Sequence, residues 1–256
     1  MSALLERILA DKRARLERGE YAPAAVPPPR PSDGAAFVRA LREPGVRIVA
    51  EIKHRSPSSG ELLPDADGRL ETIALEYRRG RAAALSVVVE EDYFGGRPDW
   101  LPRAKRISGL PALIKDFIVS ERQLDFACSL GADAVLLIVR ALDEAGLTRL
   151  HEAARQRGLA TVVEAHSGEE IRRAAAVAPD VLGVNARDLS TFSIDLTALE
   201  ALVSSIPAGP VRLAESGIRT RAEVERLRAA GYEAFLVGEA LLRSEDRVEA
   251  LRGLAR

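Results

Sequence analysis

From residue 46 onward, the chain alternates between short aliphatic runs and longer stretches in which apolar and polar positions are mixed. The aliphatic runs cover residues 46–52, 83–89, 111–114, 134–139, 160–163, 181–184, 211–214 and 234–237. Between them, apolar positions recur at helical spacing over residues 70–79, 121–130, 143–157, 169–177 and 221–230. Runs that are apolar on both faces are typical of buried parallel strands, and regular alternation of strand and helix predicts an α/β fold.

The number of these units distinguishes between two α/β architectures. Eight units within about 210 residues match a (β/α)8 TIM barrel in number and in length. A doubly wound open sheet is the alternative, but the Gly-x-Gly-x-x-Gly fingerprint of that fold does not follow the first predicted strand. We therefore predict a TIM barrel.

The first 45 residues follow a different pattern. Residues 1–19 predict an amphipathic helix, whereas residues 21–33 contain five prolines and cannot form regular structure. A second short helix is expected around residues 34–42. We interpret residues 1–45 as an N-terminal helical extension with a proline-rich segment, packed on a barrel formed by residues 46–256, the whole being one domain.

Composition excludes several classes of protein. The 256 residues are 47% hydrophobic with a net charge of −1, which argues against long disordered regions and against nucleic acid as a partner. We expect no membrane partner, because no apolar run reaches the roughly 20 residues that span a bilayer, and charges interrupt any signal-peptide pattern at the N-terminus. The single cysteine, Cys128, excludes an intrachain disulfide and is interpreted as a core residue, so we expect a reducing compartment, the cytoplasm.

Chemistry in a TIM barrel is located at the C-terminal ends of the strands. Polar residues follow the aliphatic runs there, namely the cations Lys53, Lys115 and Arg187, the carboxylates Glu51, Glu164 and Glu215, and the amide Asn185. Any one of them is more simply read as a solvated charge, and a Lys–Glu pair can be a structural ion pair. Together they predict a site where converging charges perturb one another, as acid–base catalysis requires.

The loops after the seventh and eighth predicted strands are the usual phosphate site of this fold. They contain Ser216-Gly217 and Gly238-Glu239, and Ser56-Pro57-Ser58 follows the first strand. Glycine allows backbone N–H groups to approach an anion closely. We therefore predict a phosphate-binding cradle.

The histidines do not predict a metal site, because His54, His151 and His166 lack the spacing of a ligand set. We expect His151 on the surface of a helix. We interpret His54 and His166 as exposed residues close to the rim of the site.

Several of these residues stand in motifs that follow one another along the chain. The motifs are Glu51-Ile52-Lys53 with Ser56-Pro57-Ser58, Lys115-Asp116-Phe117, Gly183-Val184-Asn185 with Arg187-Asp188-Leu189, Glu215-Ser216-Gly217 and Val237-Gly238-Glu239. In this order the sequence resembles the indole-3-glycerol phosphate synthase family over essentially its whole length. Sister barrel enzymes of tryptophan synthesis share the phosphate loops but not the first two motifs.

The resemblance implies conversion of 1-(2-carboxyphenylamino)-1-deoxyribulose 5-phosphate to indole-3-glycerol phosphate, CO2 and water in tryptophan biosynthesis. It implies a phosphorylated small molecule as substrate and no metal or organic cofactor. We expect a monomer, with a dimer as the alternative.

The resemblance also implies residue roles. Lys115 corresponds to the general acid of ring closure, and we expect the surrounding charges to tune its pKa toward neutrality. Lys53 corresponds to the cation that binds the anthranilate carboxylate and is a second candidate acid for dehydration. Glu164 and its partner Glu51 correspond to the acid–base carboxylates.

The remaining implied residues contact the substrate. Asn185 and Arg187 correspond to groups that contact its carboxylate or hydroxyls, and Glu215 lies near the sugar hydroxyls. The implied phosphate cradle consists of Ser56, Ser216, Gly217, Gly238 and Glu239. The implied apolar wall for the aromatic ring consists of Pro57, Phe94, Phe117, Leu136 and Ile138.

The sequence departs from the family pattern at His54-Arg55, Ala165-His166 and Ala186, none of which is a proton-carrying position of the implied reaction. Two other functions stay open. One is a Schiff-base aldolase with Lys115 or Lys53 as nucleophile. The other is a degenerate barrel that binds a phosphorylated ligand or a partner without catalysis, and the complete set of Lys and Glu residues argues against it.

Overall fold

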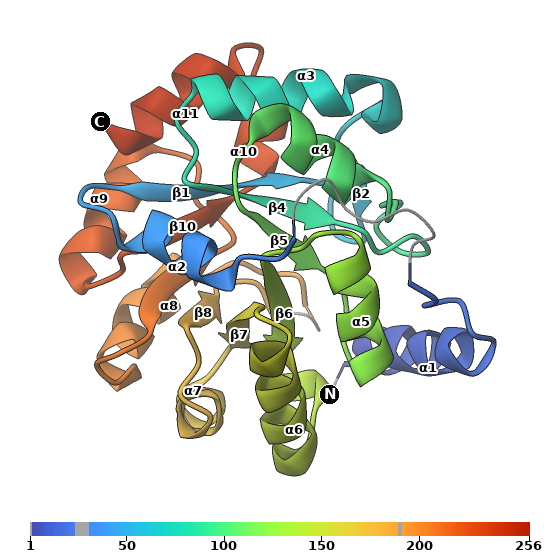
Figure 1. Cartoon of the computed structure of the whole chain (residues 1–256). Coiled ribbons are helices and arrows are strands. Elements are labelled where there is room, and N and C mark those ends of the chain that lie inside the picture. Colours follow the sequence, from blue (N-terminus) through green and yellow to red (C-terminus); the bar gives the residue numbers. More distant parts are fainter. Residues whose placement is uncertain (1, 24–30, 189–190) are drawn as a thin grey trace.

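The computed structural model describes residues 2–23, 31–188 and 191–256, so Pro27, Pro28, Pro29 and Leu189 of the sequence predictions lie outside the described residues. Eight strands of the described residues form a closed parallel barrel (Figure 1). They are β1 (Arg47–Ile52), β4 (Ala84–Val88), β5 (Ala112–Lys115), β6 (Ala134–Ile138), β7 (Ala160–Ala165), β8 (Val181–Asn185), β9 (Val211–Glu215) and β10 (Ala234–Val237). β1 closes the barrel because it pairs with both β4 and β10. The predicted TIM barrel is confirmed.

Helices follow the strands and surround the barrel. They are α3 (Ala66–Arg79), α4 (Trp100–Ser108), α5 (Glu121–Ser129), α6 (Glu144–Gln156), α7 (Gly168–Ala176), α8 (Leu196–Leu202), α9 (Arg221–Ala230), α10 (Glu239–Leu242) and α11 (Arg247–Ala255). A short hairpin of β2 (Arg55–Ser56) and β3 (Gly60–Glu61) follows β1, and 3-10 turns η1 (Val139–Ala141) and η2 (Val203–Ser205) complete the described elements.

Capping residues start several helices directly after a strand end. At α9, the Thr220 hydroxyl accepts from the Glu223 backbone N–H at 3.3 Å, and the Glu223 carboxylate accepts from the Thr220 N–H at 2.8 Å. Ser120 and Ser167 cap α5 and α7 in the same position. These caps satisfy the first helical N–H groups within short loops, which fixes the strand ends where the site lies.

The apolar core has two layers because successive strand residues point to opposite faces of the sheet. Along β1, Val49 packs inside the barrel with residues such as Leu113 and Leu213 of other strands. Its neighbours Ile48 and Ala50 pack outward against the surrounding helices. The inner layer leaves the C-terminal strand ends free for polar side chains.

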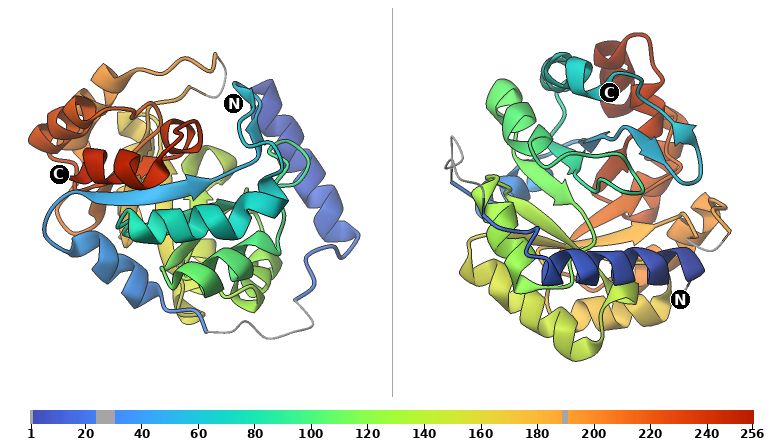
Figure 2. Two further views of the ribbon diagram at one scale, coloured as in Figure 1. Left: turned by 90° about the horizontal axis from the view of Figure 1, so that it is seen from above. Right: turned by 90° about the vertical axis from the view of Figure 1, so that its right-hand side faces the viewer.

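Helices α1 (Ala3–Glu17) and α2 (Gly34–Arg42) lie at opposite ends of the barrel (Figure 2). α2 packs against the start of β7, where a Cβ atom at Gly34 would lie only 2.4 Å from the Ala160 backbone N. α1 packs at the other end and buries Leu5, Ile8 and Leu9. The interpretation of residues 1–45 as an extension of a single domain stays a prediction.

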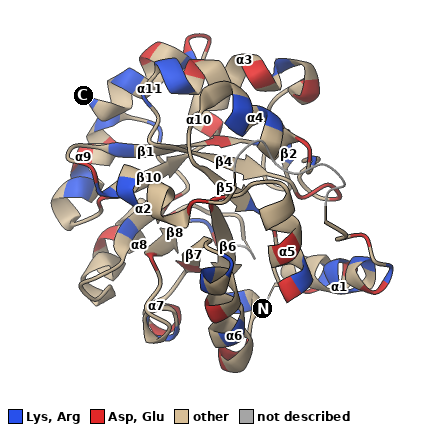
Figure 3. Cartoon of the chain, in the orientation of Figure 1, with Lys and Arg blue, Asp and Glu red and all other residues tan. Residues whose placement is uncertain are grey.

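Charged residues of both signs are interspersed on outer helices such as α1 and α6 (Figure 3). No helix in the described part of the chain is long and apolar enough to cross a membrane. The expectation for His151 was wrong, since this side chain is 3% exposed and its Nδ1 lies 2.9 Å from the Thr161 hydroxyl. It is buried because α6 turns this face toward β7.

Candidate active site

The strand ends converge on one pocket, which contains nearly all of the predicted site residues. Those that line it are Glu51, Lys53, Ser56, Pro57, Phe94, Lys115, Phe117, Leu136, Ile138, Glu164, Asn185, Arg187, Glu215, Ser216, Gly238 and Glu239. Gly217 follows Ser216 and is not among the lining residues. The structure therefore brings together residues from all parts of the barrel sequence, although their individual roles stay predictions.

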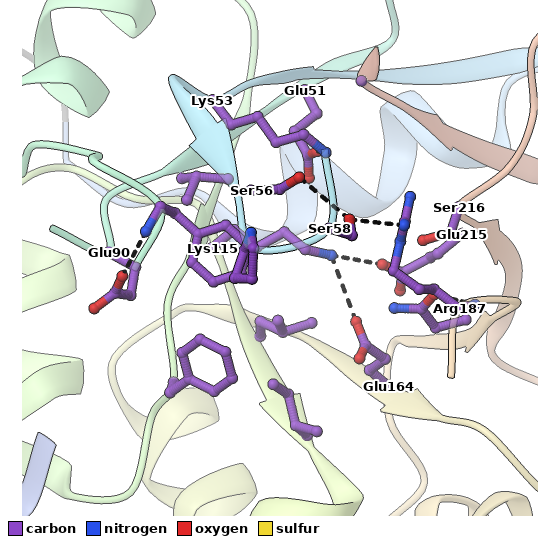
Figure 4. Close-up of a pocket in the computed structure, with 18 of the residues that line it drawn as sticks. Glu51, Lys53, Ser56, Ser58, Glu90, Lys115, Glu164, Arg187, Glu215 and Ser216 are labelled. Atoms are coloured by element: carbon purple, nitrogen blue, oxygen red, sulfur yellow. Dashed lines mark hydrogen bonds and ion pairs between the residues drawn. The ribbon is translucent and has the colours of Figure 1, made fainter. Parts of the chain in front are cut away.

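Lys115 occupies the centre of the polar part of the pocket (Figure 4). Its Nζ lies 2.6 Å from Glu215 Oε2 and 3.5 Å from Glu164 Oε2. The lysine ends β5, whereas the two carboxylates stand on β9 and β7. Both carboxylates are buried, at 1% and 3% exposed, so the three charges interact with little screening by water.

The sequence-based expectation for the pKa of Lys115 was wrong in direction. Burial alone would lower the pKa of this ammonium, but Glu215, Glu164 and Glu51 together raise it well above its usual value. Lys115 is therefore firmly protonated in this pocket. The error arose because these carboxylates reach Lys115 from three different strands.

The two carboxylates beside Lys115 respond in opposite directions. Burial raises the pKa of Glu215 to about 7, although the Lys115 ammonium opposes the shift and the Glu164 carboxylate adds to it. Burial also acts to raise the pKa of Glu164, but Lys115 and His166 overcome it and hold that pKa below its usual value. The site thus holds an ionised carboxylate beside one that gains a proton near neutral pH.

A second ion pair stands at the end of β1. Lys53 Nζ lies 2.6 Å from Glu51 Oε1, and Glu51 is 4% exposed. Burial would raise the pKa of Glu51, but Lys53 and then Lys115 lower it. Glu51 is therefore ionised and fixes the Lys53 ammonium in the pocket.

Loops with unusual backbone geometry form part of the pocket lining. Ser216 and Gly217 have φ of 71° and 78°, values that favour glycine, so Ser216 is held in a conformation rare for its type. A Cβ atom at Gly238 would meet Glu51 Oε1 at 2.6 Å, so only glycine leaves room for the Glu51 carboxylate. Arg187 donates to the Ser58 hydroxyl at 2.8 Å across the same region.

An apolar wall forms another part of the same pocket. The rings of Phe94 and Phe117 lie 6.2 Å apart, and Leu136 and Ile138 of β6 complete this side. Such a surface fits a planar aromatic group. Among the described residues, no cluster of His, Cys, Asp or Glu has the arrangement of a metal site.

Sequence reasoning missed several residues of the pocket. Leu5 and Ile8 of α1 line it, as does Glu90 at the end of β4. His166 was expected to be exposed, but its side chain is 2% exposed and Nε2 lies 3.5 Å from Glu164 Oε1. Spacing by two along the strand end could have placed His166 on the same face as Glu164.

Gly183 of β8 is a further residue whose importance comes from its missing side chain. A Cβ atom there would lie 2.2 Å from Glu215 Oε1. A glycine inside an otherwise aliphatic strand run was the available signal.

The family comparison decides between the functions that a charged TIM-barrel pocket allows. Residues 5–254 match the family model described as indole-3-glycerol phosphate synthase. The chain belongs to the indole-3-glycerol phosphate synthase family. As a member of this family it is an enzyme, a carboxy-lyase of tryptophan biosynthesis that acts on a phosphorylated small molecule.

Relatives of the same name cover nearly the whole chain. The indole-3-glycerol phosphate synthase of Azospirillum brasilense is 41% identical over 99% of both chains. Indole-3-glycerol phosphate synthase 2 of Streptomyces coelicolor is 45% identical over 90% of this chain and 87% of its own length.

Solved structures of other enzymes share the fold with this family member. Thiamine phosphate pyrophosphorylase from Pyrococcus furiosus is 18% identical, with a TM-score of 0.60 over 85% of this chain and 95% of its own. Orotidine 5'-phosphate decarboxylase from Pyrococcus horikoshii is 14% identical, with a TM-score of 0.62 over 81% and 96%. At this identity the likeness concerns the barrel alone.

Proposed function

We propose that this pocket closes the indole ring of 1-(2-carboxyphenylamino)-1-deoxyribulose 5-phosphate, with Lys115 as the general acid. The observation that carries the proposal is the position of the Lys115 ammonium, beside two buried carboxylates in a pocket that Phe94 and Phe117 also line. Family membership supplies the reaction, and the geometry supports the assignment of its proton donor.

Ring closure requires one proton at the ketone oxygen. The aromatic carbon that bears the carboxylate attacks the ketone carbon, and the oxygen that becomes an alkoxide takes a proton from Lys115. Loss of CO2 then breaks the bond to the carboxyl carbon, and its electron pair restores the aromatic ring. The raised pKa keeps Lys115 charged until an alkoxide, a stronger base than any neighbouring carboxylate, forms beside it.

Dehydration requires an acid for the departing hydroxyl and a base for the proton lost from the adjacent carbon. We assign the base to Glu164, whose pKa is held low, with Glu51 as its partner carboxylate across Lys115. Lys53 would bind the anthranilate carboxylate and is a second candidate for the acid. Its pairing with Glu51 keeps the ammonium at a fixed position.

Binding uses the remaining pocket residues. Asn185 Oδ1 accepts from the Arg187 backbone N–H at 2.9 Å, which orients the Asn185 side chain. Asn185 and Arg187 would contact the carboxylate or the hydroxyls of the substrate. Glu215 would contact the sugar hydroxyls. The proposed phosphate cradle is Ser56, Ser216, Gly217, Gly238 and Glu239, the last two through backbone N–H groups at the start of α10. The proposed wall for the aromatic ring is Pro57, Phe94, Phe117, Leu136 and Ile138.

The Schiff-base alternative is disfavoured at Lys115. A lysine nucleophile must be neutral, whereas the neighbouring carboxylates raise the pKa of this one. Treatment with borohydride in the presence of the substrate checks this directly, and we expect no covalent adduct at Lys115.

The test of the proposed acid compares Lys115→Met with Lys115→Arg. General acid catalysis contributes about 10²–10⁴-fold, and an arginine keeps the charge but does not release a proton. We expect both variants to lose at least about 100-fold in kcat in a fluorescence assay for indole-3-glycerol phosphate. Near-normal turnover by Lys115→Arg would show that charge alone suffices and would contradict the assignment.

A further inference from the structure

Helix α1 carries a buried cation that the proposed mechanism does not use. The Lys12 side chain is 2% exposed, and its Nζ lies 2.7 Å from Asp116 Oδ1 and 3.3 Å from Glu90 Oε1. The ammonium also lies 5.7 Å from the centre of the Tyr21 ring. A buried ammonium persists only where such partners balance its lost hydration, so this arrangement constrains both sides of the contact.

The two carboxylates that hold Lys12 line the pocket themselves and are bonded to the backbone of the aromatic wall. Asp116 Oδ1 accepts the backbone N–H of Phe117 at 2.8 Å. Glu90 Oε2 accepts the backbone N–H of Phe94 at 3.0 Å. Each carboxylate therefore holds the backbone of one of the two rings that form the wall.

Lys12 also determines whether these carboxylates can stay where they are. Asp116 and Glu90 are 7% and 1% exposed, and the same ammonium bridges them. Without it, two buried carboxylates would face each other unpaired, and one would take up a proton or move away. Either response changes the hydrogen bonds to the wall.

The same helix extends the wall with its own side chains. Ile8 precedes Lys12 by four residues, so the two lie on one face of α1, and Ile8 lines the pocket. The helix is thus fixed at the pocket by a polar contact one turn away from its apolar contact. Its position relative to Phe94 and Phe117 depends on Lys12.

We propose that Lys12 is a positioning residue that holds the aromatic wall, and with it the aromatic ring of the substrate, by tying α1 to the ends of β4 and β5. The proposal rests on the proposed function, because the wall is assigned to the ring of that substrate. Lys12 acts through Asp116 and Glu90 and does not touch the reacting atoms. Its loss is therefore expressed in substrate binding more than in the chemical step.

The test is the kinetics of Lys12→Met, with Arg15→Met as the matched control. Arg15 lies on the same helix and pairs with Glu91 and Asp92 of the same loop, but these side chains do not hold the wall. We expect Lys12→Met to raise KM about tenfold while kcat falls less than about threefold, since the wall is displaced and the acid is not. We expect Arg15→Met to change KM less than about threefold.

A second variant covers the case in which Lys12→Met does not fold. In Lys12→Gln/Asp116→Asn both charges are removed, and an amide pair can still hydrogen-bond and accept from Phe117. We expect circular dichroism to show that this double variant folds. Its KM should be closer to that of the unaltered enzyme than to that of Lys12→Met. If Lys12→Met is unfolded, the KM of the double variant should lie within about threefold of that of the unaltered enzyme.

The results separate this proposal from the proposed function. An unaltered enzyme that forms no indole-3-glycerol phosphate would overturn the proposed function. An active enzyme in which Lys12→Met leaves KM unchanged, or in which Arg15→Met raises KM equally, would overturn the role of Lys12. A folded Lys12→Gln/Asp116→Asn variant with the same KM as Lys12→Met would also overturn the role of Lys12. Where Lys12→Met is unfolded, a KM of the double variant about tenfold above that of the unaltered enzyme would do so.

Discussion

Glu215 shows how burial can give a single carboxyl a pKa near neutral pH. With a pKa raised to about 7, this carboxyl is close to half protonated at neutral pH. Its position depends on a neighbour that has no side chain, since Gly183 leaves the space that Glu215 Oε1 occupies. The distance from Lys115 to Glu215 is thus set by a glycine on the adjacent strand.

Replacing Gly183 with alanine tests this dependence. The added methyl group would lie 2.2 Å from Glu215 Oε1, so the carboxylate must move away from its contact with Lys115. We expect kcat/KM to fall at least about tenfold because catalytic groups tolerate little displacement. Gly253→Ala in α11, where an added Cβ atom would meet nothing within 4 Å, is the matched control and should leave the kinetics unchanged. Unchanged kinetics in Gly183→Ala would show that the Glu215 position is not needed.

At the scale of elements, the sequence predicted the strands well and the outer helices less well. The strand runs are visible because both faces of each strand are buried, as in residues 181–184 of β8. The regular alternation implied helices at α4 and α8 without delimiting them, and α4 carries a proline within its first turn, a residue that usually marks a loop. α11 was missed because it packs on α3 and α9 and follows no strand.

The candidate site was predictable in membership but not in electrostatics. Motifs at strand ends identify Lys53, Lys115 and Glu164, because the C-terminal ends of all the parallel strands lie at the same end of the barrel. The direction of the pKa shift at Lys115 depends on which partners lie within a few ångströms, and these come from other strands. That α1 lines the pocket with Leu5 and Ile8 was not predictable from its sequence pattern. The pattern shows that the helix has an apolar face, but it does not show which part of the protein that face packs against.

The start of α7 shows how an outer helix is attached to the end of β7, next to Glu164. Glu170 accepts from the His166 backbone N–H at 2.8 Å and from Arg140 of η1 at 2.5 Å. Burial would raise the pKa of Glu170, but the hydrogen bonds from His166 and Arg140 lower it to about 2. This carboxylate therefore links α7, η1 and the end of β7.

Glu170→Gln tests this link through the pH dependence of stability. The folded-state pKa lies below the value of 4.5 for the unfolded chain, so Glu170 stabilises the fold fully above pH 4.5 and loses that contribution as the pH falls toward 2. Between pH 6 and pH 3 we expect the unfolding free energy of the unaltered protein to lose up to about 2 kcal/mol more than that of Glu170→Gln. Denaturant titrations at pH 3 and pH 6 measure the difference. Glu169→Gln, an exposed neighbour, should retain the full acid dependence.

At the scale of the whole molecule, the two ends of the barrel have different tasks. The C-terminal end carries the pocket, whereas the other end is closed by α2 and a buried polar network around Asp133. Asp133 accepts from Lys105 at 2.7 Å, from the Asp33 N–H at 2.9 Å and from the Ala112 N–H at 2.8 Å. A TIM barrel commonly separates stability and catalysis in this way.

Asp133→Ala is expected to affect stability and not catalysis. It leaves Lys105, which is 7% exposed, without its buried partner, and loss of such a partner destabilises by about 3–5 kcal/mol. The midpoint of denaturant unfolding should fall accordingly, while kcat/KM below the transition stays within about twofold. Asp125→Ala removes an exposed pair with Arg157 and should change stability by less than about 1 kcal/mol. A large loss of kcat/KM in Asp133→Ala would contradict the separation of the two ends.

The pairing of β1 with β10 has a consequence for how the protein is made. These strands come from opposite ends of the barrel sequence, so during translation β1 emerges long before the strand that covers its edge. Contacts between distant segments slow folding, and an uncovered strand edge invites association with other chains. The nascent barrel therefore stays open, and exposed to misassembly, until β10 has left the ribosome.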